Sequence, residues 1–583
     1  MAGRQDDRAA VRHLSRRQAL RLLGGAGGAA LLAACGGTAT PTTGAGGTGA
    51  STAPPTTNAG GAGAPATSPT TGGATATTKI AAPPTRASLG GTAAAGGTPA
   101  STAASGPVGA ITIPQSAVPL PTDKVSFRWI DSGDLKALFY KKYFAAYQQA
   151  HPNITIQYDP LPWCEIQKVV PLGVQNGNAH DVFQLPLNVP AGQAVSEGWV
   201  APLDDLILNF AEWKARFPFG AFIEGVHVFN GKTYTFPLTS NKRYGTLLLY
   251  NTAYLQQAGY DPASKPFTWD EFRTAAKKLT AQGKGQYYGF IFGGKDSTEF
   301  SGKVSNLARM AGASAGGNNV NWKTGQYNYT ADQYLAAIDL LLALKADGSV
   351  FPGVLSLNGP DARSRMPQGV SAMILDGPWN IPQWPRENAN FAFGVASQPV
   401  PNSGQPLPLT YEETGANQVW AYAKSPNKAI IADMFSYVAS DEGQTAIVVA
   451  SEGNLRSFFP QAQARAEQSQ ELDPHARQAI ALFEQQVRVG PMPQVRNPEQ
   501  SQVDLELKHI HPDFGEVVQG LYTGQLKDPK AAMQDLQDRM DKELDRAIKA
   551  AQAKGAKVSR DDWKFPNWDP TRDYTKADYD AAK

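Results

Sequence analysis

The chain has 583 residues, and its 53 Lys and Arg against 51 Asp and Glu give a formal charge of +2. This length predicts more than one domain, and the near balance of charge gives no general attraction to nucleic acid or to an anionic membrane. Two cysteines exclude a disulfide-based scaffold. No run of about 18 apolar residues is present that would cross a bilayer as a helix.

Residues 1–35 have the three parts of an export signal. Arginines dominate up to residue 21, residues 22–34 are apolar or Gly, and the stretch ends in Leu-Ala-Ala-Cys at Cys35. This ending resembles a bacterial lipobox, which would make Cys35 the lipid-bearing first residue of the mature protein. Such a cysteine carries more than one acyl chain, as lasting membrane attachment requires. We therefore expect the protein on the outer face of the cytoplasmic membrane, attached through the lipid alone.

Two export routes fit this signal. The run from Ser15 to Leu20 resembles a twin-arginine signal. It has Ala19 where Phe is usual, so the Sec route also stays open.

Residues 36–119 are expected to form a tether. Up to residue 110 they are nearly all Gly, Ala, Thr, Pro and Ser, and Lys79 and Arg86 are the only charges. Such a segment cannot bury enough apolar surface to offset the entropy lost on ordering. We expect a disordered stalk that holds a globular module away from the membrane. Its many Thr residues leave O-glycosylation open.

From about residue 120 the chain alternates between strand and helix patterns. Residues 125–130 alternate as a strand, and apolar side chains at helical spacing follow over 135–146. A second strand is expected at 154–158, a second helix at 163–174 and a short buried strand at 181–185. This β-α-β-α-β order predicts an open α/β sheet. In such sheets ligands lie at the carboxyl ends of the strands.

Signals of helix ends recur later in the chain. Thr268 and Glu271 have the spacing of a capping box. Ser425 before Pro426 predicts an N-cap followed by Pro at the first helical position. An apolar stripe over 533–548 predicts a long helix. The residues after about 555 are polar and rich in Trp and Asp, and we expect them to be loosely ordered.

Seven short phrases occur in a consistent order over most of residues 120–550. They are His151–Ile156, His180–Phe183, Glu197–Asp204, Asn230–Pro237, Leu249–Asn251, Ala258–Glu271 and Gly369–Trp379. Together they resemble the extracellular solute-binding proteins of ABC importers, family 1, the sugar-binding group. The second phrase departs from the family pattern, because His180 stands where the family has Pro.

The resemblance implies an α/β fold of the periplasmic-binding-protein type, with two lobes, hinge strands and a ligand cleft between the lobes. Crossovers between the lobes are implied near 246–251, 408–417 and 453–458. The expected division is as follows: lobe 1 at 120–250 and 409–455, lobe 2 at 251–408 and 456–554, and a polar tail at 555–583. The implied partners are a carbohydrate or similar polar solute and ABC permease subunits. No cofactor is implied, and we expect a monomer.

A sugar is bound by aromatic rings against its C–H faces and by planar polar side chains around its hydroxyl rim. Trp379 leads the candidates, because the family often stacks a sugar on the Trp of its G-x-W phrase. The other candidates follow predicted strands or flank a crossover: Trp129, Asp131, Trp163, Glu165, Asn241, Arg243, Tyr244, Glu412, Glu413 and Trp420. Each also fits a structural role, such as a core position for Trp129 or a solvated turn for Glu412 and Glu413.

Two motifs of enzymes are present in incomplete form. Residues 312–316 fit G-x-S-x-G, but they follow a helix pattern where a nucleophile elbow requires a strand. Residues 289–296 nearly fit a phosphate-binding loop, but Asp296 replaces the Ser or Thr that binds magnesium and no helix pattern follows at once.

Metal and thiol chemistry are weakly indicated. His509 and His511 are two residues apart and have no Cys cluster beside them, which disfavours a metal site. Cys164 fits a small buried side chain.

We therefore expect a binding protein without catalysis. A lipid-anchored glycan hydrolase stays open, since a glycosidase needs only two carboxylates across a cleft. A non-transport solute sensor or surface adhesin also stays open.

Overall fold

The computed structural model describes residues 108–133, 135–161, 163–186, 189–313, 316 and 319–582. The expected export signal, Cys35 and the tether up to residue 107 lie outside the described residues. The end of the expected tether, residues 108–119, lies against the globular part, where Ile111 and Ile113 pack on a buried core. No helix in the described part of the chain is long and apolar enough to span a membrane.

The first sheet has the strand order β11-β3-β1-β2. β1 (Val125–Asp131) pairs in parallel with β2 (Ile154–Pro160) and β3 (Val182–Phe183), and β11 (Trp420–Ala421) runs antiparallel to β3. Its two faces are covered by different helices, because successive strand residues point to opposite sides. Trp129 packs with the aromatic side chains of α2 (Lys136–Ala150). Its neighbour Ile130 lies in a cluster with α3 (Trp163–Gln175).

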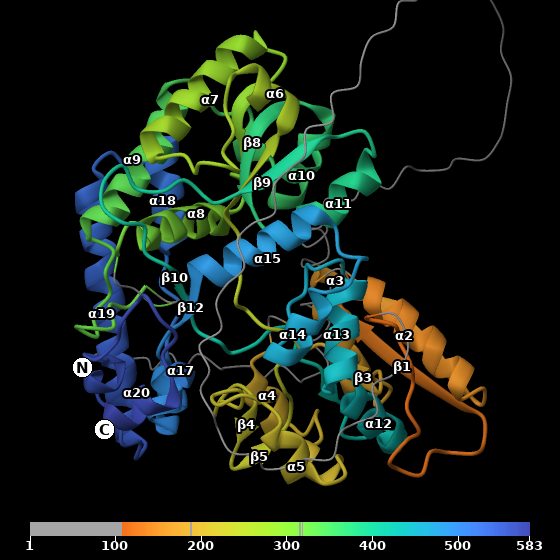
Figure 1. The fold of residues 1–583 in the computed structure, drawn as a ribbon. Helices are drawn as coiled ribbons and strands as arrows, with labels where there is room; N and C mark the ends of the chain where they lie inside the picture. Colours follow the sequence, from red (N-terminus) through yellow and green to blue (C-terminus); the bar gives the residue numbers. More distant parts are fainter. Residues whose placement is uncertain are drawn as a thin grey trace, which may run out of the picture. The chain divides into compact units, whose positions relative to one another are not determined.

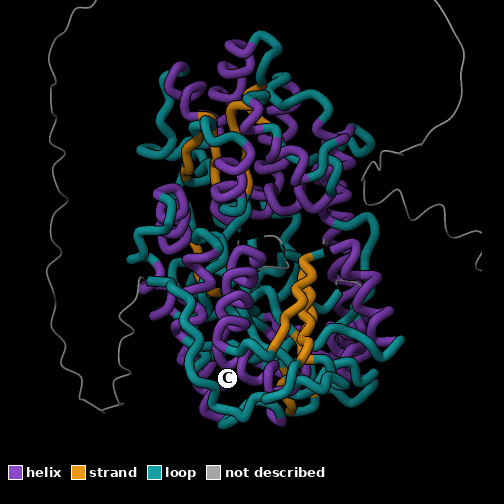
Figure 2. The backbone as a smooth tube through the Cα atoms, turned by 90° about the vertical axis from the view of Figure 1, so that its right-hand side faces the viewer, coloured by secondary structure: helices purple, strands orange, loops and turns teal. Residues whose placement is uncertain are grey.

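The second sheet has the order β7-β8-β6-β9. β7 (Tyr288–Ile291) is parallel to β8 (Ser371–Asp376), and β6 (Leu247–Asn251) is antiparallel to both β8 and β9 (Phe393–Ala396). All five residues of β6 are buried, as expected for a central strand covered on both faces. The strands of the two sheets form separate groups in Figure 2.

Each sheet is the centre of one lobe. Around the first sheet lie α4 (Ala191–Ser196), α5 (Phe210–Ala215), the hairpin β4 (Val228–Phe229) and β5 (Lys232–Thr233), α12 (Lys428–Val438), α13 (Asp441–Ala450) and α14 (Pro460–Ala466). Around the second lie α6 (Thr252–Gln257), α7 (Trp269–Gly283), α8 (Ser297–Met310), α9 (Asp332–Ala346), α10 (Gly359–Ser364), α11 (Asn380–Glu387), α15 (Pro474–Gln486), α16 (Pro493–Arg496), α17 (Ser501–Glu506), α18 (Phe514–Thr523), α19 (Pro529–Ala553) and α20 (Lys576–Ala581). Figure 1 shows α15 running between the two groups.

The chain crosses between the lobes through neighbouring segments. Backbone bridges join Thr239 to Ala416 and Ser240 to Arg456, so three distant parts of the sequence meet here. A further two-stranded sheet, β10 (Leu409–Tyr411) with β12 (Val487–Val489), lies beside the second lobe core.

Two expected lobe boundaries differ from the structure. The boundary at 250 falls inside β6, whose whole length belongs to the second sheet. The boundary at 455 falls before α14, which packs on α13 in the first lobe.

The residues after 555 are packed, in contrast to the loosely ordered tail that we expected. Six of their apolar side chains are buried in the core of the second lobe: Val558, Trp563, Phe565, Trp568, Tyr574 and Tyr579. The backbone N–H of Phe565 donates to the Trp322 carbonyl at 2.6 Å, and that of Tyr574 donates to the Val489 carbonyl at 2.8 Å. Aromatic residues spaced along a polar segment supplied enough apolar surface to order it.

The two predicted helix starts have different outcomes. Thr268 and Glu271 form the capping box at the start of α7, as predicted. The prediction for Ser425 was wrong, because α12 begins at Lys428 with Asn427 at its N-cap. The Ser425 hydroxyl instead donates to Asp181 at 2.6 Å and accepts from the Asn427 backbone at 3.0 Å. The Ser425 side chain therefore binds a carboxylate that is distant in sequence, instead of capping the helix as the local sequence predicted.

Candidate functional site: the interlobe cleft

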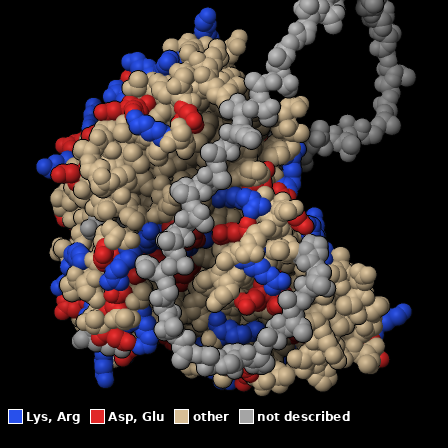
Figure 3. Space-filling model, in the orientation of Figure 1, with Lys and Arg blue, Asp and Glu red and all other residues tan. Residues whose placement is uncertain are grey.

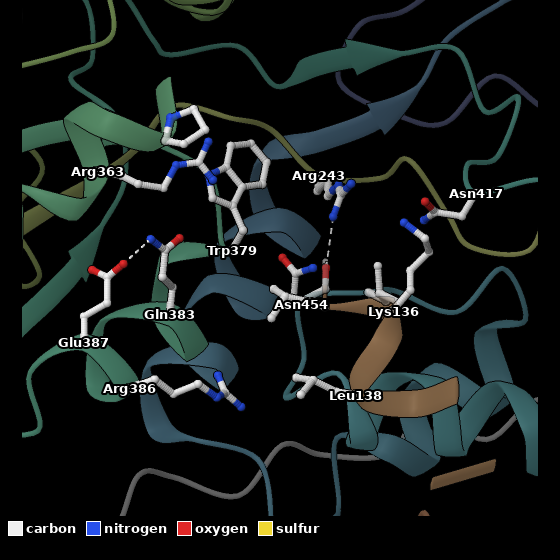
Figure 4. Close-up of a pocket in the computed structure, with 13 residues that line it drawn as sticks. Lys136, Leu138, Arg243, Arg363, Trp379, Gln383, Arg386, Glu387, Asn417 and Asn454 are labelled. Carbon is white, nitrogen blue, oxygen red and sulfur yellow. Dashed lines mark hydrogen bonds between the residues drawn. The ribbon is translucent and has the colours of Figure 1, made fainter. Parts of the chain in front are cut away.

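A cavity of about 770 Å³ opens between the two lobes, and we call it the interlobe cleft. Its first-lobe wall comes from the start of α2, its second-lobe wall from α10, α11 and the end of β8, and its base from the crossover segments. The lining residues are Leu135, Lys136, Leu138, Arg243, Pro360, Arg363, Trp379, Gln383, Arg386, Glu387, Asn417, Asn454 and Leu455. Figure 4 shows the polar side chains from these elements converging on one space.

The indole of Trp379 is the aromatic surface of the cleft. Residue 377 must be glycine for the ring to lie where it does, because a Cβ there would stand 2.2 Å from the indole carbons. The Arg363 guanidinium lies 5.3 Å from the ring centroid and that of Arg243 lies 5.9 Å from it. In Figure 4 these two guanidinium groups lie on either side of the indole. Both distances are within the range of a cation–π interaction.

Arg243 enters the cleft from the first crossover segment. Its Nη1 donates to the Asn454 carbonyl at 3.1 Å, which ties this segment to the third crossover. Burial lowers the pKa of the guanidinium from its usual value. Even so, an arginine keeps its charge at neutral pH, so this side chain places a partly desolvated cation at the base of the cleft.

Two further cations of the cleft have carboxyl groups behind them. The Nε of Arg363 lies 3.7 Å from Asp376, at the end of β8. Lys136 donates to Ser132 at 2.5 Å and lies near Asp131, at the end of β1. Burial raises the pKa of both carboxyl groups, and the two cations oppose that effect. In each lobe, a carboxyl group at the end of a strand therefore lies beside a cation of the cleft.

The rest of the polar lining is made of amides together with Arg386 and Glu387. Gln383 donates to Glu387 at 2.7 Å and to the Ser364 hydroxyl at 3.1 Å, which holds both side chains of α11 in place. Arg386 pairs with Glu452, which follows α13 of the first lobe. The amide group of Asn417 donates to Thr239 at 2.9 Å.

This lining suits a polar, cyclic solute. An indole can pack against a C–H face, while guanidinium and amide groups bind oxygen atoms around the rim. The volume is within the range of small-molecule sites, and residues of both lobes contribute to it. Closing the lobes would bring these groups onto the same solute.

Residues 132–445 match the family described as bacterial extracellular solute-binding protein. The match spans more than half of the chain and includes parts of both lobes. The chain belongs to this family. No curated protein matches the chain.

Solved structures of solute-binding proteins have the same two-lobed fold. One is an ABC transporter solute-binding protein of Thermotoga lettingae TMO bound with α-D-tagatose, with TM-score 0.52 and 18% identity, covering 73% of this chain and 100% of that one. Another is the GacH receptor of Streptomyces glaucescens GLA.O, studied with acarbose, with TM-score 0.51 and 17% identity over 72% and 98%. A third, from Agrobacterium radiobacter K84 and in complex with ribitol, has TM-score 0.50 and 18% identity over 72% and 99%.

Of the predicted site residues, Arg243 and Trp379 line the interlobe cleft of this solute-binding protein. Others surround the hinge. Glu413 accepts from the Ser240 hydroxyl at 2.5 Å and from the Asn241 backbone at 2.8 Å, and Glu412 adjoins it in sequence. Glu413 and Asn241 therefore connect the first crossover segment to the second.

The remaining candidates are placed away from the open space. Trp129, Tyr244 and Trp420 are buried in the cores of their lobes. Asp131 is also buried and accepts from Tyr158, Trp129 and the Gly133 backbone, so it supports the cleft through Lys136. Glu165 lies in the first turn of α3 and pairs with Lys168 at 3.1 Å on the surface. Trp163 begins α3, and its side chain lies outside the described part of the structure.

Sequence reasoning missed several lining residues. They are Lys136, Arg363, Gln383, Arg386, Asn417 and Asn454. For Lys136 a signal existed, since it follows a predicted strand end by a few residues. Arg363 and Asn454 belong to no phrase of the family pattern, and only the fold brings them to the cleft.

The phosphate-loop alternative is corrected by the structure in one respect. α8 begins at Ser297, directly after residues 289–296, although the sequence showed no helix there. The loop is nevertheless filled by protein, since a Cβ on Gly293 would lie 2.4 Å from the Gly359 nitrogen. The Asp296 carboxylate accepts from that same Gly359 N–H at 3.2 Å. The space of a phosphate is therefore taken by the start of α10.

The other two motifs lie next to helices. A helix, α8, precedes residues 312–316, as the sequence predicted. His509 and His511 lie in the loop between α17 and α18, where the Nδ1 of His511 donates to the Glu516 carboxylate at 2.9 Å. Among the described residues, no group of three or more His, Cys, Asp or Glu is placed to hold a metal ion.

Proposed function

We propose that this solute-binding protein binds a sugar or oligosaccharide in the interlobe cleft and delivers it to an ABC import permease. The family is one of extracellular solute-binding proteins, and neighbours of the same fold have been solved with tagatose, acarbose and ribitol. The proposal is a binding function that leaves the solute chemically unchanged. The protein acts as a monomer that passes its solute to the permease subunits.

One observation carries this proposal: Trp379 faces a cavity whose other walls come from both lobes. A sugar ring stacked on the indole contacts α11 and the β8 end directly. Lys136 and Leu138 then lie on the opposite wall, and closing the hinge brings them onto the same sugar. The ligand therefore favours the closed arrangement, because it gains contacts there that the open arrangement lacks.

The test is a thermal-unfolding screen of the purified protein against mono- and oligosaccharides, followed by calorimetry on each hit. A ligand present at 100 times its dissociation constant stabilises the folded state by about 2.7 kcal/mol. The recovered sugar is analysed by chromatography, because a hydrolase would shorten an oligosaccharide and a binding protein would return it intact. A panel in which no saccharide stabilises the protein would contradict the proposal.

We also propose that Cys35 is lipidated and holds the protein at the outer face of the cytoplasmic membrane. The sequence Leu-Ala-Ala-Cys after an apolar run supports this proposal. Cys35→Ser should leave the globular part folded and able to bind ligand while releasing it from the membrane fraction or leaving it unprocessed. Wild-type processing and membrane extraction of Cys35→Ser would show that the anchor lies elsewhere.

A further inference from the structure

The described lining of the interlobe cleft has more positive than negative charge. The described cavity is lined by one carboxylate, Glu387, and by four cationic side chains, which are Lys136, Arg243, Arg363 and Arg386. Glu387 is itself held by neutral donors, since the Gln383 amide and the Ser364 hydroxyl donate to it. A neutral sugar needs hydrogen-bond donors and acceptors in a mixed set, so an excess of cations is informative.

Three of these cations have an anionic neighbour in the protein. Arg386 contacts Glu452, and Arg363 lies 3.7 Å from Asp376. Lys136 is attracted by Asp131, which lies in the wall behind it. Each of these three cations therefore has a carboxyl group of the protein beside it before any ligand enters.

Arg243 differs from the other three. Its described hydrogen bond is to a neutral acceptor, the Asn454 carbonyl, and it forms no ion pair with a carboxylate of the described residues. Burial lowers the pKa of Arg243, and the Tyr411 phenol and, more weakly, Glu413 oppose that effect. The oxygens of Glu413 already accept from Ser240 and Asn241. Arg456 adds a second positive charge on the same side.

A guanidinium in such a place is costly unless an anion joins it. Removing a charge from water is unfavourable, and a partner of opposite sign offsets that loss. The Arg243 guanidinium also lies 5.9 Å from the Trp379 centroid, beside the surface on which we propose that the sugar stacks. An acidic group on the rim of a stacked sugar would therefore lie within reach of this cation.

We propose that the cleft selects an acidic saccharide, and that Arg243 binds the carboxylate of a uronic acid residue whose ring lies on Trp379. This inference rests on the proposed function and names the class of sugar. A carboxylate matches the single uncompensated guanidinium in charge, whereas a phosphate monoester carries about 1.5 to 2 negative charges near neutral pH. The planar fork of arginine also matches the two oxygens of a carboxylate.

The experiment compares matched sugars by calorimetry on the full purified protein. The pairs are D-galacturonic acid with D-galactose, D-glucuronic acid with D-glucose, and the corresponding disaccharides. A separate probe, D-glucose 6-phosphate, tests whether the cleft prefers a phosphate to a carboxylate. We expect an acidic sugar to bind at least about tenfold more tightly than its neutral counterpart, the effect of one charge-assisted hydrogen bond. The preference should shrink as salt is added.

Variants assign the preference to Arg243. Arg243→Gln should remove the preference for the acidic sugar, and Arg243→Lys, which keeps the charge without the fork, should retain part of it. The matched control is Arg273→Gln on α7. It breaks a pair with Asp347 at the end of α9, involves no residue that lines the cleft, and should change neither affinity nor preference. Thermal unfolding of each unliganded variant shows whether it is folded.

The outcomes separate this inference from the proposed function. If neutral sugars bind as tightly as acidic ones, or if a folded Arg243→Gln keeps the preference, the inference is overturned and the sugar-binding function stands. Tighter binding of the phosphate than of every uronic acid overturns the assignment to a carboxylate. If no member of the panel binds, charged or neutral, the inference falls together with the proposed function.

Discussion

The interlobe cleft and a second cavity lie on neighbouring parts of the same crossover segments, and they use charge differently. The second cavity, of about 640 Å³, is lined by residues 573–576 of the C-terminal segment together with the hinge, and we call it the tail cavity. There Lys242 lies 3.4 Å from Glu484 and 3.8 Å from Asp573, and Arg456 contacts the same Glu484. Each cation that lines the hinge side of the tail cavity therefore has a carboxylate within the protein.

The contrast separates a structural use of charge from a functional one. In the tail cavity the charges join the C-terminal segment to the hinge. In the interlobe cleft Arg243 lacks such a partner within the described residues, and an aromatic ring lies beside it. On the face shown in Figure 3, acidic and basic side chains are interspersed over the C-terminal helices, as in the tail cavity. We infer that the tail side stabilises the fold and the cleft side binds solute.

The largest expected effect concerns the stability of the tail side. Phe565 is fully buried between Trp322, Tyr574 and Tyr579. Phe565→Ala should lower the free energy of unfolding by about 3–5 kcal/mol, because it leaves a cavity in a packed aromatic cluster. Denaturant unfolding of the unliganded protein measures this loss.

The matched control lies at the edge of the same region. Phe219 is 56% exposed and lines the tail cavity, so Phe219→Ala should cost about 1 kcal/mol or less. Equal losses for the two variants would mean that the C-terminal segment is not packed as described, and the comparison of the two sides would lose its basis.

A smaller effect, on binding and not on folding, is expected at Trp379. Trp379→Ala should weaken binding of the cognate sugar by about 2 kcal/mol or more, a factor of about 30, because it removes the stacking surface. Trp379→Phe keeps part of that surface and should lose less. Calorimetry on both variants measures the change in affinity.

Trp269 supplies the control for a lost tryptophan. It begins α7, packs in the core of the second lobe and donates to the Pro399 carbonyl at 3.2 Å, away from the cleft. Trp269→Ala should reduce stability and leave the affinity of the remaining folded protein unchanged. A folded Trp379→Ala that binds as tightly as wild type would move the stacking surface to another residue.

The smallest expected effect is on the pH dependence of stability, which should have opposite signs on the tail side and on the cleft side. Against the effect of burial, Arg456 and Lys242 hold the pKa of Glu484 below its usual value. Its charged form therefore stabilises the folded state above about pH 4.5, and this contribution is lost as the pH falls through the lowered pKa. Since Glu484 is half exposed, Glu484→Gln should cost only about 1 kcal/mol at pH 7 and less in acid.

Asp376, which lies beside Arg363 of the cleft, should show the opposite trend. Burial raises its pKa above 3.8, so its ionisation reduces stability as the pH rises through the raised value. Asp376→Asn cannot ionise, and its stability relative to wild type should therefore increase with pH. Unfolding of both variants between pH 3 and 7 checks the two signs. Parallel trends would contradict the difference in charge balance.

The sequence predicted the elements better than the site. β1, α2 and β2 follow from local periodicity, which reports burial of one face directly. Trp379 and Arg243 were found because a family phrase or a crossover lies beside them. Lys136 and Arg363 were not, because the cleft joins segments that are more than two hundred residues apart and no local pattern records that contact.

The same limit explains the placement of Trp129 and Tyr244. Both stand where the sequence predicts a strand end or a hinge, and both were candidates for the cleft. The Trp129 ring instead packs on Tyr140 and Phe144, and the Tyr244 hydroxyl donates to Gln486 at 2.5 Å. A large aromatic side chain near a strand end fits either a core or a ligand surface, and the packing of distant helices decides between them.

The account rests most directly on closure of the two lobes around a sugar at the interlobe cleft. X-ray scattering on the purified protein, with and without a saturating saccharide identified by calorimetry, measures that closure. We predict that the radius of gyration decreases on binding for the wild type, and that Trp379→Ala needs about thirtyfold more sugar for the same decrease. Tight calorimetric binding with an unchanged radius of gyration in the wild type would contradict the assignment of the solute to the cleft between the lobes.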